Sequence, residues 1–226
     1  MDFLEGLAFR RERVTARIVT PDGLETDRPI EIRTHPVTGR TCRITFSRSG
    51  ETEAGTRRLP DPPPHVDQAD SCPFCRPQLE IKTPRFPKAF YAPGRMVTGR
   101  SILFPNLFPY AAYSAVSLFD DRHFVEIGTA ALSSYTDCLV NCAAYLKRIR
   151  ETDAAVVCMG IAQNHLPSAG GSLLHPHLQV HADRVASNHH RFLAQRTRDY
   201  RAATGRGIFS DILEHEKTDG TRVIGH

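Results

Sequence analysis

The sequence predicts an α+β fold, in which helices pack against an antiparallel sheet. Two strand-like segments, residues 28–34 and 41–47, flank a Thr38-Gly39 turn and form a predicted hairpin. Residues 126–150 carry apolar side chains at intervals of three and four, the pattern of a helix with one buried face. Two further strand-like segments and then two helical segments follow. Because strands and helices are grouped rather than strictly alternating, an antiparallel sheet is favoured over a parallel one.

Irregular segments surround this hairpin in the first part of the chain. Residues 1–24 contain a short amphipathic stretch and a turn-rich connector, TPDGLETD. Residues 50–69 are poor in apolar side chains and rich in proline, so an irregular loop is expected there. Prolines also recur through residues 71–93, which predicts a knuckle and a loop without regular structure.

The remaining elements follow in order after residue 100. Residues 101–104 and 113–119 have strand character and are separated by a turn at Pro105-Asn106. The predicted helix over 126–150 ends in basic side chains, which suit the negative end of a helix dipole. The elements predicted beyond it are strands over 154–162 and 173–183 and helices over 190–203 and 208–217.

Composition places the chain among globular proteins. Of its 226 residues, 40% are hydrophobic and 24% are charged, a balance that excludes a wholly disordered chain. The net charge of +4 is too small to indicate a nucleic-acid partner, although it suits a site for phosphate esters. The apolar runs are too short to span a bilayer, and the N-terminus shows no apolar segment of a secretory signal. We therefore expect no membrane partner and a cytoplasmic location.

A histidine-rich strand carries the strongest chemical signal. Alternate side chains of a strand share one face, so in HPHLQVH, residues 175–181, three histidines and Gln179 are expected to point the same way. Such a concentration of nitrogen ligands and proton carriers predicts a functional site. The loop before it contains Gly170, Gly171 and Ser172, whose backbone amides and hydroxyl could approach a phosphate. Taken alone, that loop is a weak signal.

Cys72 and Cys75, in the segment SCPFC, are the only cysteines with a suggestive spacing. A redox C-x-x-C motif opens a helix, whose N-terminus stabilises the thiolate, but prolines follow here and no helical pattern begins. A zinc knuckle fits better, and it needs two further ligands that are distant in sequence. Spacing leaves the choice of ligands open among His35, His65, His123, His165, His175 and His181.

At this point the sequence resembles a known family. Asn164, the Gly-Gly-Ser loop and His175-Pro176-His177-Leu178-Gln179 are similar, in spacing too, to the N-terminal half of galactose-1-phosphate uridylyltransferases, a branch of the histidine-triad superfamily. HPVTGR at residues 35–40, SCPFC and Phe104-Pro105-Asn106 resemble further motifs of that family. The resemblance implies a histidine-triad-like antiparallel sheet with packed helices and a zinc knuckle.

The resemblance also implies roles for individual residues. His177 would be the nucleophile that forms a covalent nucleotidyl-histidine, and Gln179 would hydrogen-bond the phosphoryl oxygens or the leaving group. Arg48 would reach a nucleotide across a dimer interface. The implied zinc ligands are Cys72, Cys75, His123 and His175. The implied nucleotide-binding residues are Arg48, Asn106, Asn164, Gly170, Gly171, Ser172 and Gln179.

The expected activity is transfer of UMP between UDP-glucose and a hexose 1-phosphate, by a homodimer that holds Zn²⁺. Gln179 favours transfer over hydrolysis, because a neutral amide cannot protonate a leaving group as a histidine can. The alternatives are an ADP-glucose-type phosphorylase and a non-catalytic, zinc-stabilised nucleotide-binding module. The domain organisation expected is an N-terminal extension over residues 1–27 and a uridylyltransferase N-terminal-like domain over 28–226, without the second half of the family fold.

Overall fold

A computed structural model describes residues 10–45, 66, 68–126, 131–166, 169–220 and 223. The described residues form two compact units: one from the segments within 1–58 and 188–226, the other from those within 59–187. The second unit holds the histidine-rich strand. No helix of the described residues is long and apolar enough to cross a membrane.

A five-stranded sheet organises the second unit, and every neighbouring pair of its strands is antiparallel. The strand order is β4-β5-β6-β8-β7. The strands are β4 (Met96–Thr98), β5 (Ser101–Pro105), β6 (Tyr113–Leu118), β7 (Cys158–Ala162) and β8 (His177–Asp183). The last and histidine-rich strand, β8, therefore lies inside the sheet between β6 and β7. The predicted α+β class with an antiparallel sheet is confirmed.

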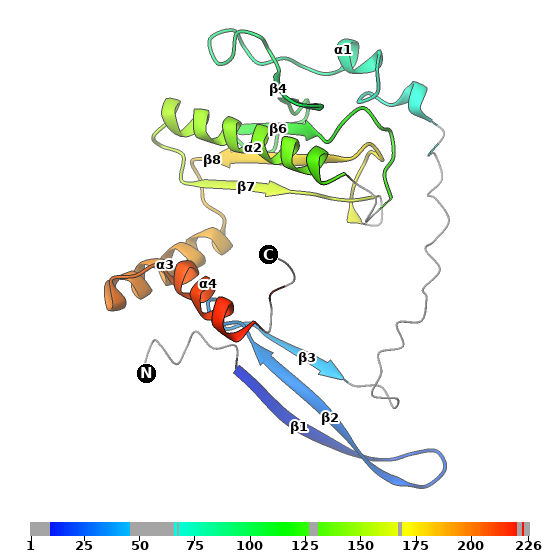
Figure 1. Ribbon diagram of the computed structural model, residues 1–226, viewed down its shortest axis with the longest axis vertical. Helices are drawn as coiled ribbons and strands as arrows, with labels where there is room; N and C mark the ends of the chain where they lie inside the picture. The colour runs from blue at the N-terminus through cyan, green and yellow to red at the C-terminus, as the bar shows by residue number, and fades with distance from the viewer. Residues whose placement is uncertain are drawn as a thin grey trace. The chain divides into compact units, whose positions relative to one another are not determined.

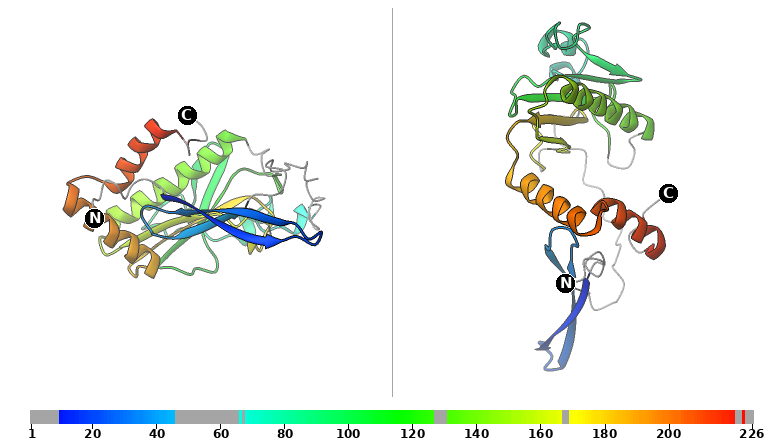
Figure 2. Two further views of the ribbon diagram at one scale, coloured as in Figure 1. Left: turned by 90° about the horizontal axis from the view of Figure 1, so that it is seen from below. Right: turned by 90° about the vertical axis from the view of Figure 1, so that its left-hand side faces the viewer.

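Helix α2 (Leu132–Thr152) lies along one face of this sheet (Figures 1 and 2). Its buried side chains pack against alternate residues of the central strands, which gives the unit its core. The fully buried Asn141 ties the helix to the sheet, because its Nδ2 donates to the Ser101 carbonyl at 3.1 Å and its Oδ1 accepts from Thr98 at 2.8 Å. The core comprises Leu103, Ala115, Leu178, Val180, Ala182, Cys138, Cys142, Tyr145 and Ile149, among others.

The opposite face of the sheet carries a second apolar layer and the polar side chains of β8. Leu79, Phe104, Val116 and Leu118 are buried together there. Leu79 comes from α1 (Gln78–Lys82), a short helix preceded by the 3₁₀ turn η2 (Ala69–Ser71). Since Leu178, Val180 and Ala182 face α2, strand alternation places His177, Gln179 and His181 on this opposite face.

The other unit consists of a three-stranded antiparallel sheet and two helices (Figure 1). In its β2–β3 turn Gly39 has φ +68°, a conformation that a side chain disfavours, so the predicted Thr38-Gly39 turn is confirmed. Val37, Tyr200 and Ile208 form a small buried core, beside which Tyr200 donates to Asp211 at 2.7 Å. The elements are β1 (Arg10–Val19), β2 (Glu25–Thr34), β3 (Thr41–Thr45), α3 (Asn188–Thr204) and α4 (Ile208–Asp219).

Two expectations on individual elements were wrong, and one strand was not expected. Within the segment described from the sequence only as a short amphipathic stretch and a connector, residues 10–19 form β1, in which Val14, Ala16 and Ile18 alternate with polar residues at the period of a strand. The segment 71–93 does contain a helix, α1, which follows Pro77, a residue tolerated in a first helical turn. Strand β8 starts at His177 rather than at residue 173, because Pro176 cannot donate to a ladder.

The predicted boundaries also shift elsewhere. Helix α2 begins at Leu132 instead of residue 126, and β7 begins at Cys158 instead of residue 154. Most of the predicted loop over residues 50–69 lies outside the described residues.

Candidate metal centre and adjoining cavity

The segment SCPFC folds into a tight turn that presents two cysteines on the same side. The Cys75 amide donates to the Cys72 carbonyl at 3.2 Å, and the Leu79 amide donates to the Cys75 carbonyl at 2.8 Å. These bonds link the turn to α1. Cys72 and Cys75 are both buried free thiols.

Two histidines from distant segments join these cysteines. The ligand atoms of Cys72, Cys75, His123 and His175 all lie within 4.8 Å of one another. Cys75 Sγ lies 3.4 Å from Nδ1 of His123 and 3.4 Å from Nδ1 of His175. Two thiolates and two imidazoles are a donor set that suits tetrahedral zinc, so the four residues could hold a metal ion. The structure thus brings together the four residues named by the family resemblance.

A hydrogen bond and burial fix His175 in the orientation that a metal ligand needs. His175 is fully buried, and its Nε2–H donates to the Asp120 carbonyl at 2.9 Å, which directs Nδ1 toward Cys75. The Asp120 carboxylate is itself held by Arg122 and by the Ser134 hydroxyl at 2.8 Å. Burial lowers the pKa of His175 to about 4, so the ring is neutral at pH 7 and can act as a ligand.

Burial shifts the pKa of the Cys75 thiol in the opposite direction to that of His175. Burial raises its pKa to about 12, since the charged thiolate is poorly solvated there, and the nearby Cys72 acts in the same direction. A divalent cation bound by the four residues would supply the charge that stabilises the thiolate.

His177 opens strand β8 and is held in one tautomer. Its Nδ1–H donates to the carbonyl of His175 at 2.8 Å, so Nε2 carries the lone pair. The ring is buried, and burial lowers its pKa, which favours the neutral form. The ring of Phe74 packs edge-on against it with centroids 5.4 Å apart. The imidazole is therefore neutral, oriented and limited in its movement, as a nitrogen nucleophile needs to be.

A cavity of about 280 Å³ lies beside this imidazole. His177, Gln179, Ser172 and Asn106, all predicted from the sequence, line it together. Lys82 adds a positive charge. The walls are otherwise largely apolar, and comprise Pro73, Phe74, Pro84, Phe104, Leu107, Phe108, Val116 and Leu173. A cavity with a polar end and flat apolar walls suits a ligand with a phosphate and an aromatic ring.

Of the remaining predicted nucleotide residues, Asn164, Gly170 and Gly171 are not among the described residues that line this cavity. Asn164 and Gly171 belong to a compact loop in which the Gly171 amide donates to the Leu166 carbonyl at 3.0 Å. A side chain at position 171 would lie 2.9 Å from the Asn164 carbonyl, so glycine is needed for the loop to close. Gly170 has φ +85°, which also favours glycine. The two glycines thus shape the loop that carries Ser172. Arg48 lies outside the described residues.

Sequence reasoning missed the walls of the cavity. Phe74 and Phe108 had no predicted role, and Phe104 was predicted only as part of the Phe104-Pro105-Asn106 turn rather than as a wall of the cavity. Lys82, in the last turn of α1, was missed because no helix was expected in that segment. The signal that could have indicated these residues is that they lie in or near the motifs SCPFC and FPN.

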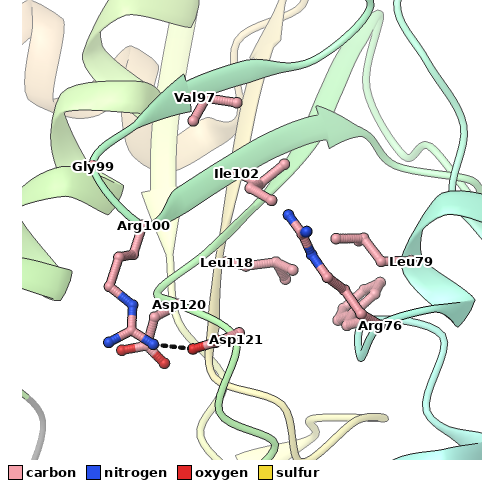
Figure 3. Close-up of a pocket in the computed structure, with 10 residues that line it drawn as sticks. Arg76, Leu79, Val97, Gly99, Arg100, Ile102, Leu118, Asp120 and Asp121 are labelled. Atoms are coloured by element: carbon pink, nitrogen blue, oxygen red, sulfur yellow. Dashed lines mark hydrogen bonds and ion pairs between the residues drawn. The ribbon is translucent and has the colours of Figure 1, made fainter.

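Phe74 also lines a second cavity, of about 300 Å³. There Arg76 extends past Leu79 toward Ile102, and Arg100 forms an ion pair with Asp121 (Figure 3). None of the site residues predicted from the sequence is among the described residues that line this cavity.

The chain has similarity to a known sequence and to solved structures. No protein-family model matches the sequence. An uncharacterized protein of Archaeoglobus fulgidus is 28% identical over 221 residues, which cover 97% of this chain and 63% of that protein. Two solved structures from Arabidopsis thaliana match the chain with a TM-score of 0.49 each: an ADP-glucose phosphorylase with bound ADP-glucose and a galt-like protein.

The similarity to the solved structures is limited. The ADP-glucose phosphorylase is 20% identical and the match covers 78% of this chain and 56% of that one. The galt-like protein is 19% identical, with 77% of this chain and 54% of that one covered. The chain thus spans less than two thirds of the length of each of these three proteins. The case for an activity therefore depends on the residues of the site.

Proposed function

We propose that the protein transfers a nucleoside monophosphate through a covalent intermediate on His177. The observation that carries this proposal is the hydrogen bond from His177 Nδ1–H to the His175 carbonyl, which leaves the Nε2 lone pair at a cavity shared with Gln179 and Ser172. A neutral imidazole approaches a negatively charged phosphoryl group more readily than a carboxylate does.

The reaction consists of two in-line displacements. In the first, the Nε2 lone pair of His177 attacks the α-phosphorus of a nucleotide sugar, the Nε2–P bond forms, and the P–O bond to the leaving sugar 1-phosphate breaks. In the second, a phosphate oxygen of the acceptor attacks the same phosphorus and the Nε2–P bond breaks. His177 keeps its Nδ1 proton throughout, so the transfer needs no net proton uptake. Ser172 and Gln179 supply hydrogen bonds to the phosphoryl oxygens.

Zinc at Cys72, Cys75, His123 and His175 would be structural in this scheme. Four protein ligands complete a tetrahedral site, and a closed site leaves no position for a substrate. When bound, the ion would fix the backbone of His175, whose carbonyl orients His177. The residues of the chain, rather than the metal, then carry out the transfer.

The substrate pair that we propose is UDP-glucose and a hexose 1-phosphate, handled by a cytoplasmic homodimer. The support for this choice is the sequence resemblance, together with Gln179 at the position where a histidine would favour hydrolysis. A second candidate is phosphorolysis of ADP-glucose, which uses the same covalent step with inorganic phosphate as the acceptor.

The test is to incubate the protein with UDP-glucose or with ADP-glucose and to weigh the intact chain and its peptides. A UMP adduct on His177 from UDP-glucose is expected, with no adduct in the His177→Gly variant at unchanged metal content. An AMP adduct from ADP-glucose, with no UMP adduct from UDP-glucose, would select the phosphorylase. A chain that forms no adduct with either substrate would be a nucleotide-binding module and would refute the proposed transfer.

A further inference from the structure

The polar side chains on one face of β8, here called the polar strip, are His177, Gln179 and His181, and they extend beyond the cavity. His181 follows His177 and Gln179 on the same face of the strand, two residues beyond Gln179. At about 3.3 Å per residue, its backbone lies about 13 Å along the strand from that of His177. Nothing in the transfer chemistry described above uses this third side chain.

An aromatic hydroxyl lies beside His181. The Tyr110 hydroxyl is 3.4 Å from His181 Nδ1, and the two rings lie 5.6 Å apart at 55°. Tyr110 is 56% exposed, so much of its ring is accessible. The two side chains together offer an aromatic surface and groups that donate and accept hydrogen bonds.

The neighbouring strands leave room around this pair. Gly160 is the cross-strand partner of His181 on β7, and Ala162 is the partner of Gln179, so both of these β7 partners are small residues. A Cβ at position 160 would lie 2.6 Å from Cε1 and 2.8 Å from Nε2 of His181. The imidazole therefore lies across the glycine, in a position that any larger residue would exclude.

A buried hydroxyl adds an unsatisfied polar group on the other side. Ser114 of β6 is the second cross-strand partner of His181 and is 7% exposed. Its Oγ has no hydrogen-bond partner among the described residues. An unpaired buried hydroxyl costs stability, so such groups are few in native proteins, and a bound ligand or water can supply the missing hydrogen bond.

We propose that His181 and Tyr110 form the subsite that recognises the sugar of a nucleotide sugar, the hydroxyl-rich part that leaves with the second phosphate. This inference rests on the proposed transfer at His177. The cavity with flat apolar walls suits the base, whereas the strip beyond Gln179 offers what a sugar needs: hydrogen-bonding groups of both kinds and an exposed ring beside small residues. The pair thereby distinguishes substrates by their leaving group.

The experiment compares two UMP donors, UDP-glucose and UDP. The leaving group is glucose 1-phosphate from the first donor and inorganic phosphate from the second. The rate of formation of the His177 adduct is measured for the wild-type chain, His181→Phe and Tyr110→Phe. His181→Phe keeps a ring but removes its hydrogen bonds, and Tyr110→Phe removes only the hydroxyl. Each variant is expected to slow the adduct from UDP-glucose about tenfold, the effect of losing one good hydrogen bond, and to leave the rate with UDP unchanged.

Gly160→Ala provides an independent variant, because it displaces the imidazole of His181 without removing it. The same selective loss with UDP-glucose is expected. Equal slowing with both donors, or no change with either, in the Tyr110→Phe and Gly160→Ala chains would overturn the sugar subsite. If the wild-type chain forms no adduct even from UDP, the proposed transfer itself fails, and that outcome is distinguished from a failure of the subsite alone.

Discussion

The cysteine at the centre of the metal cluster allows a quantitative prediction. Cys75 Sγ lies 3.4 Å from both histidine nitrogens, so Cys75→Ser removes the donor that touches each of them. We expect the variant to lose its zinc, because serine oxygen is a poor substitute for a thiolate ligand.

The expected loss of folding stability follows from the length of the loop that the metal closes. Cys75 and His175 are 100 positions apart in the sequence, and linking the ends of a loop of that length stabilises the folded state by about 5 kcal/mol in the chain-entropy treatment. For the unit within residues 59–187, with an unfolding entropy of about 2.1 cal/mol/K per residue, this corresponds to a fall of about 18 °C in Tm.

The assay measures zinc per chain by elemental analysis and Tm by calorimetry, both in zinc-replete buffer. Cys42→Ser is the matched control, since Cys42 is an exposed free thiol on β3 outside the cluster. Cys42→Ser should retain zinc and keep its Tm within about 2 °C. Full zinc retention in Cys75→Ser, or a Tm no lower than that of the control, would refute the reasoning.

Three further variants test the surroundings of the site. Asp120→Asn removes the charge that Arg122 and Ser134 hold in place behind His175, and should weaken zinc binding about tenfold in a chelator competition. Ser172→Ala should slow formation of the nucleotide adduct about tenfold or more without changing zinc content, measured by single-turnover mass spectrometry. Arg48→Ala should weaken nucleotide binding in calorimetry at unchanged zinc content; a strictly monomeric chain with undiminished affinity would contradict this. Activity should return in part when Arg48→Ala and His177→Gly chains are mixed.

The arrangement of the histidine-rich strand could be predicted because it depends on local geometry. Alternation along HPHLQVH places Gln179 and His177 on one face without knowledge of the rest of the fold. The Thr38-Gly39 turn was predictable for the same reason, since a positive φ at glycine is a local property. The spacing of Cys72 and Cys75 indicated a metal, but only the family resemblance selected His123 and His175 as their partners.

Features that depend on tertiary contacts could not be predicted in this way. The apolar walls at Phe74 and Phe104 gain a role only when α1 and β5 lie against one face of the sheet. The Asp120 carbonyl that orients His175 is a backbone group, which leaves no signature in the sequence. Strand β1 was missed because its arginines obscure the alternation of Val14 with its neighbours.

The most direct test of the central claim, transfer through His177, is a chase of the isolated adduct. The wild-type chain is loaded from UDP-glucose, freed of substrate, and divided among buffers that contain glucose 1-phosphate, inorganic phosphate or water alone. We predict that glucose 1-phosphate discharges His177 rapidly and regenerates UDP-glucose, while water releases UMP slowly because Gln179 cannot act as a general acid. An adduct that water discharges as fast as glucose 1-phosphate does, or that no phosphate acceptor discharges at all, would contradict the account.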